Sequence, residues 1–384
     1  MIKVCMITHD QIEKKFPKAD LIRFKCLGEA LAKRSIEVVY VSSNENIRFE
    51  ESFYKGSKVY KIPFVTRIRM IQVFFFYIFL FPVLLRIRRH GRLHIIFINS
   101  IIMVPFALML KRLGRGKCVQ FDLMGILSEE KFLKLQKTLC VTVAKKIFSL
   151  LEDLLWSQVD FITTINDQHK HILQNRIGKP IYVIRDGVFE SFLKNTLVKI
   201  KNPLNPSNVN LIFVGQINHF RLDTIFRVLP DLVKELSNLK LNILGLGPQE
   251  EYYKVKTKSL RLNENVTFYG YVPYEEIVNY LSEADIAYTD DWSIIGFPMK
   301  LFDYMAFGKA IVAENTESIK ELVTEQINGL LYSNETELKE KILMLAKDSI
   351  LRKKLGDTAR GSMAQHTWEK RAEKLKNIYQ QFIF

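Results

Sequence analysis

GFPMKLFDYMAFGKAIVA, residues 296–313, is the stretch that decides the fold. Its pattern predicts a short helix between two strands, because Pro298 suits a first helical turn, Gly308 suits a helix end and Ile311 begins an apolar strand. The strand expected before it, residues 285–288, runs into a polar loop. The helix should therefore open at the carboxyl end of a parallel strand, where open α/β sheets bind their ligands.

Two residues of this helix suggest what the ligand is. Exposed N–H groups at a helix amino terminus favour an anion, and Lys300 adds a full positive charge, so a phosphate is expected. Asp303 lies one turn later and can accept hydrogen bonds from hydroxyl groups such as those of a ribose. The same pattern also fits a capped surface helix with an incidental lysine, and this stretch alone leaves both interpretations open.

The positive charge of the chain is concentrated in its first half. The 384 residues predict two domains, and 48% hydrophobic residues are typical of a globular protein. Residues 1–185 carry 31 Lys and Arg against 15 Asp and Glu, whereas the remainder carries 25 against 26. The first half is therefore expected to meet an anionic partner: a nucleic acid, an acidic polysaccharide or an anionic lipid surface.

The cysteines and the amino terminus predict a cytoplasmic protein. Cys5, Cys26, Cys118 and Cys140 form no close pair in the sequence, so we expect small core residues, with neither a disulfide framework nor a metal site. The opening MIKVCMITHD is too short for the apolar region of a signal peptide.

Strands and helices alternate along most of the chain, which predicts two doubly wound α/β domains. The boundaries we expect are residues 1–190 for the first domain, 191–208 for a linker containing two prolines, and 209–367 for the second domain. A last amphipathic helix, residues 368–384, is expected to return to the first domain.

One segment does not follow this alternation. Residues 70–85 are uncharged and rich in Phe, and arginines flank them on both sides, among them Arg86, Arg88 and Arg89. A spanning helix needs roughly 20 residues, and Pro82 should interrupt this one, so a transmembrane span is not expected. Burial in the first domain and an interfacial helix with arginines on lipid headgroups both remain open.

Three glycine turns at predicted strand ends could contact a nucleotide. Gly215 and Gln216 end one strand and Arg221 follows, so backbone N–H groups and a guanidinium could meet phosphate oxygens. A second turn contains two glycines for which a structural role is favoured, and in the third Tyr271 and Val272 could hold a nucleobase.

Taken in order, these segments resemble a family-4-like glycosyltransferase of the GT-B type. The segments FVGQ…R, ILGLGP, VTFYGYVPYEEIVNYLSEADIAY and GFPMKLFDYMAFGKAIVA occur at the intervals of that family. Less specific likenesses, such as DLMG near Asp122, extend over the first half. The resemblance implies two Rossmann-like domains facing a cleft, with a nucleotide sugar held by the second and the acceptor by the first.

By this likeness Asp303 binds the ribose, and Gly296, Phe297 and Pro298 lie under the sugar and diphosphate. Gly215 matches the phosphate-loop glycine, and Arg221 stands where a lysine is usual. A subgroup with a P-x-K-L-F-E-Y-like segment matches best, although Ile295 replaces a family glutamate, Gln216 replaces an arginine, and the glycine pair of the first β-α loop is missing.

The implied chemistry is charge neutralisation at the leaving diphosphate. Arg221, Lys300 and Asp122 are the expected catalytic residues, with retention of configuration and no metal or cofactor. Adjacent acids at 290 and 291 are expected to be solvated. The expected contacts to the acceptor or the membrane surface are Lys18, Arg23, Arg86, Arg88 and Arg89.

The expected function is sugar transfer to a lipid-linked or cell-surface polysaccharide or glycolipid precursor, by a protein attached peripherally to the inner face of the membrane. A non-catalytic sugar-nucleotide-binding or scaffold relative is the alternative. Nucleic-acid binding is disfavoured, because the aromatic residues cluster in one apolar block away from basic surfaces.

Overall fold

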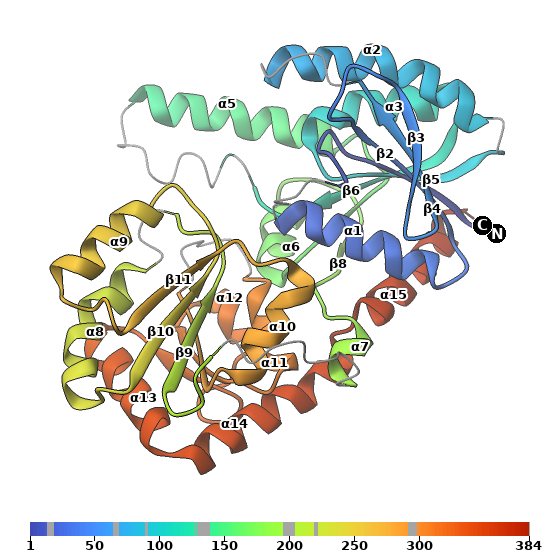
Figure 1. The fold of residues 1–384 in the computed structure, drawn as a ribbon. Coiled ribbons are helices and arrows are strands. Elements are labelled where there is room, and N and C mark those ends of the chain that lie inside the picture. Colours follow the sequence, from blue (N-terminus) through green and yellow to red (C-terminus); the bar gives the residue numbers. More distant parts are fainter. Residues whose placement is uncertain are drawn as a thin grey trace. The chain divides into compact units, whose positions relative to one another are not determined.

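The chain forms two compact α/β units in the computed structural model (Figure 1). The structure describes residues 1–13, 19–63, 69–88, 91–126, 128, 139–194, 204–218, 222–290 and 298–383. The first unit comprises Met1–Asp186 and Trp368–Phe384, and the second comprises Gly187–Thr367. The first unit thus ends slightly before the expected boundary, and half of the expected linker, residues 195–203, lies outside the described residues.

The first unit is built on an eight-stranded sheet with the strand order β3-β4-β2-β1-β5-β6-β7-β8. All neighbouring strands are parallel except β3, which pairs with β4 in the antiparallel direction. The strands are β1 (Lys3–Ile7), β2 (Glu37–Ser43), β3 (Glu50–Tyr54), β4 (Ser57–Ile62), β5 (Leu93–Ile98), β6 (Gly116–Leu123), β7 (Phe161–Thr164) and β8 (Ile181–Val183). The edge strand β3 was not expected, because its residues are mostly polar and partly exposed.

Helices complete the first unit, and the last of them comes from the far end of the chain. They are α1 (Ala19–Ala32), α2 (Arg69–Arg88), α3 (Val104–Arg112), α5 (Leu139–Trp156), α6 (Asp167–Gln174) and α15 (Trp368–Ile383). Helix α15 lies beside α1 (Figure 1). The Tyr379 hydroxyl donates a hydrogen bond of 2.7 Å to Gln120 on β6, and Lys374 Nζ donates to the Val183 carbonyl at 3.0 Å.

The Phe-rich segment forms one helix, α2, whose inner face is buried. Phe76, Leu80 and Val83 belong to the core of the unit, whereas Phe74 is 60% exposed. The helix continues through Pro82, so the expected interruption was wrong; Pro82 is exposed, and the missing hydrogen bond faces solvent. None of the helices in the described residues combines the length and apolar content needed to cross a bilayer.

A charged network lies inside the first unit, and it contains two of the expected site residues. Arg23 on α1 is fully buried, and its guanidinium pairs with Asp122 Oδ2 at 2.8 Å and with Asp186 Oδ1 at 2.7 Å. It also donates to the Ile184 carbonyl at 2.7 Å, and Thr163 donates to Asp122. Arg23 therefore does not present its charge to an acceptor, and its ion pair with Asp122 ties α1 to β6. The catalytic role expected of Asp122 stays a prediction.

The second unit contains a six-stranded parallel sheet with the order β11-β10-β9-β12-β13-β14. Its strands are β9 (Val209–Val214), β10 (Leu239–Leu244), β11 (Val266–Gly270), β12 (Ile286–Thr289), β13 (Ala310–Glu314) and β14 (Leu330–Tyr332). Its helices are α7 (Glu190–Leu193), α8 (Asp223–Glu235), α9 (Glu250–Ser259), α10 (Tyr274–Glu283), α11 (Lys300–Ala306), α12 (Glu317–Lys320), α13 (Glu335–Lys347) and α14 (Ser349–Ser362). This is the doubly wound order that the alternation predicted.

The four cysteines are free thiols, and one of them is not the core residue that was expected. Cys5, Cys26 and Cys118 are buried, and Cys140 is exposed on α5. The apolar residues around Cys140 suggested burial, yet that part of α5 faces solvent.

We expect Arg23→Met to destabilise the protein by about 3–5 kcal/mol, because it leaves two carboxylates buried without their shared cation. Urea unfolding measures this loss. Arg34→Met is the matched control, since Arg34 is 35% exposed and pairs with Glu373 at 3.5 Å; it should cost at most about 1 kcal/mol. Equal losses in the two variants would contradict the structural role of Arg23.

Candidate functional site

The candidate site lies where the strand order of the second sheet changes direction. Strand β9 pairs with β10 on one side and with β12 on the other, and the chain leaves β9 at Val214 and β12 at Thr289. The helices that follow these two strands lie on opposite sides of the sheet in doubly wound folds, which opens a crevice at the carboxyl ends. A ligand of the second unit is therefore expected beside Gly215.

Lys300 and Gly215 meet at this point. Lys300 is only 8% exposed, and its Nζ lies 3.9 Å from the centroid of the Phe213 ring. A methyl group built on Gly215 would lie 3.7 Å from the same Nζ. A largely buried ammonium beside a strand end without a side chain can bind an anionic oxygen at short range.

Tyr304 fixes α11, the helix that carries Lys300, against the strand end. Its hydroxyl accepts a hydrogen bond of 2.8 Å from the Val214 N–H, and its side chain is fully buried. Burial raises the pKa of Tyr304 well above its usual value, so the phenol stays neutral. The position of Lys300 relative to Gly215 thus depends on a residue for which the sequence suggested no role.

Gly245 packs directly against Gly215. A methyl group on Gly245 would lie 2.0 Å from the Gly215 carbonyl oxygen, and Gly245 has a φ of +143°. The Gly215 N–H donates to Leu244 at 2.9 Å, and the Gly245 N–H donates to Gly270 at 2.7 Å. The ends of β9, β10 and β11 are thus held together by backbone contacts, which agrees with the structural role favoured for this turn.

Asp303 is oriented by a tyrosine that the sequence did not single out. The Tyr274 hydroxyl donates a hydrogen bond of 2.7 Å to Asp303 Oδ1. The Tyr274 ring also lies 5.5 Å from the ring of Phe192 on α7. Tyr274 is the first residue of α10, and Asp303 lies one turn into α11, so the two helices approach each other here.

The remaining described residues of the expected donor site flank this arrangement. Gln216 is exposed, and its side-chain oxygen accepts a hydrogen bond of 3.3 Å from Asn218. Tyr271 is half-buried and Val272 is 9% exposed, directly after β11. Pro298 precedes α11, and its carbonyl accepts from the Leu301 N–H at 3.0 Å.

Several expected site residues fall outside the description. Arg221, Gly296, Phe297, Lys18 and Arg89 lie outside the described residues, and so does the side chain of Arg88. Their assigned roles stay predictions. Arg86 is exposed on α2, where its guanidinium lies 4.4 Å from the centroid of the Phe49 ring.

In the first unit, His9 and Asp10 lie after the end of β1, at the corresponding edge of that sheet. They are partly exposed, and His9 Nε2 lies 3.9 Å from an oxygen of Asp10. Acceptor chemistry is expected at this edge if the unit follows the same rule.

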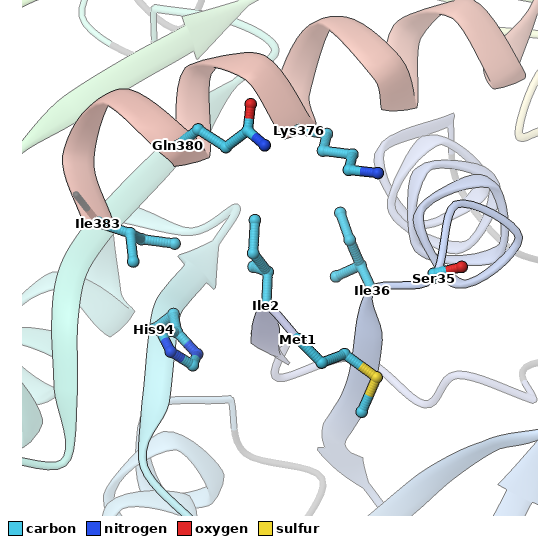
Figure 2. A pocket seen from close by; sticks show the side chains of 8 residues that line it. All are labelled: Met1, Ile2, Ser35, Ile36, His94, Lys376, Gln380 and Ile383. Carbon is cyan, nitrogen blue, oxygen red and sulfur yellow. The ribbon is translucent and has the colours of Figure 1, made fainter.

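The first unit has a cavity of about 290 Å³ on the opposite edge of its sheet. Figure 2 shows the side chains that line it. Ile2, Ile36 and His94 line it near the starts of β1, β2 and β5, together with Lys376 and Ile383 of α15. Because ligands of parallel sheets bind at the carboxyl ends of strands, this cavity is not the expected active site.

We expect Gly245→Ala to destabilise the protein by about 2–4 kcal/mol, because the new methyl group overlaps a carbonyl oxygen at a strained φ. The free energy of unfolding in urea measures this change. Gly361 on α14 is the control, since nothing lies within 4 Å of a methyl group built there. Gly361→Ala should stabilise the protein by about 0.5–1 kcal/mol, and a neutral effect of Gly245→Ala would contradict the close packing.

Comparison with known proteins shows what the second unit resembles in sequence. Residues 196–362 match the family model described as glycosyl transferases group 1. An uncharacterized glycosyltransferase of Methanocaldococcus jannaschii is 27% identical over 241 residues, which span 60% of this chain and 60% of that protein. The matched part is thus less than two thirds of that relative.

Solved structures match over nearly the whole chain. Sucrose-phosphate synthase from Thermosynechococcus elongatus has a TM-score of 0.79 at 15% identity, with 99% of both chains covered. WaaG, a glycosyltransferase involved in lipopolysaccharide biosynthesis, gives 0.73 at 13% identity, with 98% of this chain and 99% of that chain covered. Anabaena HepE in complex with UDP and glucose has a TM-score of 0.74 at 13% identity, with 99% of this chain and 100% of that chain covered.

At these identities the structural likeness establishes the fold, and the family match in the second unit adds the relationship in sequence. The chain therefore has the GT-B fold, and residues 196–362, which lie in its second unit, resemble the glycosyl transferases group 1.

Proposed function

We propose that this chain transfers a sugar from a nucleotide diphosphate sugar to a lipid-linked or cell-surface polysaccharide or glycolipid precursor. The observation that carries the proposal is the meeting of Lys300 and Gly215 at the end of β9. HepE shares the fold, and its solved structure is a complex with UDP and glucose. This supports a nucleotide sugar as the donor.

The donor would lie along the carboxyl edge of the second sheet. Lys300 would hold the diphosphate, and the open backbone at Gly215 would let its oxygens approach closely. Asp303, oriented by the hydroxyl of Tyr274, would accept hydrogen bonds from the ribose hydroxyls. Tyr271 and Val272 would contact the nucleobase.

Transfer requires that the negative charge growing on the leaving diphosphate be stabilised. Lys300 is placed for this, and we propose that Arg221 adds a second positive charge. Because the two cations, Lys300 and Arg221, can replace a divalent metal at the leaving diphosphate, we propose a metal-independent reaction. Retention of configuration, with the leaving phosphate taking the acceptor proton, is the mechanism that the family likeness favours.

The acceptor is proposed to be anionic or lipid-linked because the first half of the chain carries the charge excess. Residues 1–185 have 16 more basic than acidic residues. An anionic membrane surface would attract this half and keep the protein beside its acceptor. WaaG, which shares the fold, is involved in lipopolysaccharide biosynthesis, and this agrees with a glycolipid precursor.

A non-catalytic sugar-nucleotide-binding relative is the second candidate. Gln216 is exposed beside Gly215, where the family usually has an arginine, so the site has one cation fewer than is usual. Nucleotide release from a panel of sugar nucleotides in the presence of membranes separates the candidates. Binding of a donor without release across the panel would favour the second.

We expect Lys300→Ala to weaken UDP binding by roughly 10–100-fold, because a charge-assisted contact to phosphate is lost. The same variant should leave uridine binding unchanged, since the nucleoside has no phosphate. Asp303→Ala should weaken both ligands, because both carry the ribose. Isothermal titration with UDP, GDP and their nucleosides measures these affinities.

Lys254→Ala is the control for these titrations, because Lys254 is 42% exposed on α9 of the same unit and pairs with Glu250. It should bind like the parent protein. Equal loss of UDP and uridine binding in Lys300→Ala would place the lysine away from the phosphates.

We expect EDTA to leave the transfer rate unchanged, because Lys300 and Arg221 are proposed to neutralise the leaving group. Product formation from the active donor is followed with and without EDTA, and then with added Mg²⁺ or Mn²⁺. A loss of activity that either metal restores would overturn the metal-independent mechanism.

A further inference from the structure

Helix α5 exposes apolar side chains along most of its length. Leu139, Val143, Ile147, Leu150 and Leu154 follow one another at helical spacing and are 80, 49, 53, 60 and 60% exposed. Leu151, beside this stripe, is 50% exposed. We call these six residues the α5 outer face. The amino-terminal half of α5 extends away from the sheet of its unit (Figure 1).

The polar side of α5 faces inward instead. Arg176, which follows α6, donates from Nε to Asp153 at 2.8 Å and from an Nη atom to the Ser149 hydroxyl at 2.7 Å. The same guanidinium lies 3.5 Å from Glu152, whose side chain is 2% exposed. Helix α5 is therefore held to the unit by its polar side, with its apolar side turned outward.

This orientation is the reverse of what a water-facing helix shows. An outward apolar stripe of this extent marks a surface that contacts something other than water. Partly buried ion pairs at Arg176 fix the helix in this orientation, so the outer face is a built feature of the unit.

The charges around the α5 outer face select the partner. Residues 139–151 contain Lys145 and Lys146 but no Asp or Glu. Lys146 is exposed, and so is Arg112 at the end of the neighbouring α3. A second copy docked here would bring like charges together, whereas an anionic lipid surface complements both the apolar stripe and the basic residues.

We propose that the α5 outer face is the surface that inserts into an anionic bilayer, with α5 lying in the plane of the interface. The inference rests on the membrane placement proposed above and names the element responsible. It moves the interfacial role from the Phe-rich α2, whose inner face belongs to the core, to α5.

The test uses the full chain and vesicles of phosphatidylcholine with or without phosphatidylglycerol. The variant Ile147→Gln with Leu150→Gln removes two apolar side chains from the α5 outer face and keeps helix propensity. Its binding to the mixed vesicles in co-sedimentation should fall by about tenfold or more. Lys146→Glu should weaken binding to the mixed vesicles and leave binding to neutral vesicles unchanged.

The matched control replaces two exposed apolar residues elsewhere in the same unit. Ile47 and Phe53 are 74 and 71% exposed, and Ile47→Gln with Phe53→Gln should bind vesicles like the parent protein. Both double variants should keep the parent urea midpoint and the parent UDP affinity. Loss of vesicle binding with intact UDP binding therefore separates this proposal from the donor site.

Cys140 provides a probe in the native sequence, because it is the exposed thiol on α5 and the other three cysteines are buried. An environment-sensitive dye on Cys140 should shift its emission to the blue with phosphatidylglycerol vesicles. The proposal is overturned if the α5 variant binds vesicles like the parent, if no blue shift occurs, or if the variant abolishes self-association instead.

Discussion

The close approach of two glycines, Gly245 and Gly215, is the constraint on which the second unit depends. Gly245 leaves room for the Gly215 carbonyl oxygen in a space where even a methyl group would overlap it. This approach fixes how the chain leaves β9, and Gly215 places no side chain between the backbone and Lys300. Tyr304 then positions α11 relative to the end of β9, because its hydroxyl accepts a hydrogen bond from the Val214 N–H. The donor site we propose is thus a consequence of backbone packing at three strand ends.

The first unit uses its charges in two different ways. Arg23, Asp122 and Asp186 are buried, and their ion pairs hold α1 to the ends of the strands. Arg176 similarly holds the polar side of α5 inward. The basic residues left on the surface lie near apolar side chains, and this combination supports a lipid-facing role for the unit.

The alternation of strands and helices was enough to predict both doubly wound units and the short helix that carries Lys300 and Asp303. Apolar periodicity indicates that a segment packs against the protein as a whole. It therefore located α2, but it could not show which residues of α5 face solvent. Arg23 was misassigned because a charged residue is expected to be exposed unless its distant partner is known, and 99 positions separate Arg23 from Asp122. Tyr274 was missed for the same reason, since its contact with Asp303 joins two separate helices.

The measurement that tests the central claim most directly is a crystal structure of the protein soaked with UDP-glucose or another accepted donor. The account predicts diphosphate oxygens within hydrogen-bond distance of Lys300 Nζ beside Gly215, and ribose hydroxyls on the Asp303 carboxylate. A nucleotide bound elsewhere in the second unit, with Lys300 and Asp303 making no contact to it, would contradict the account.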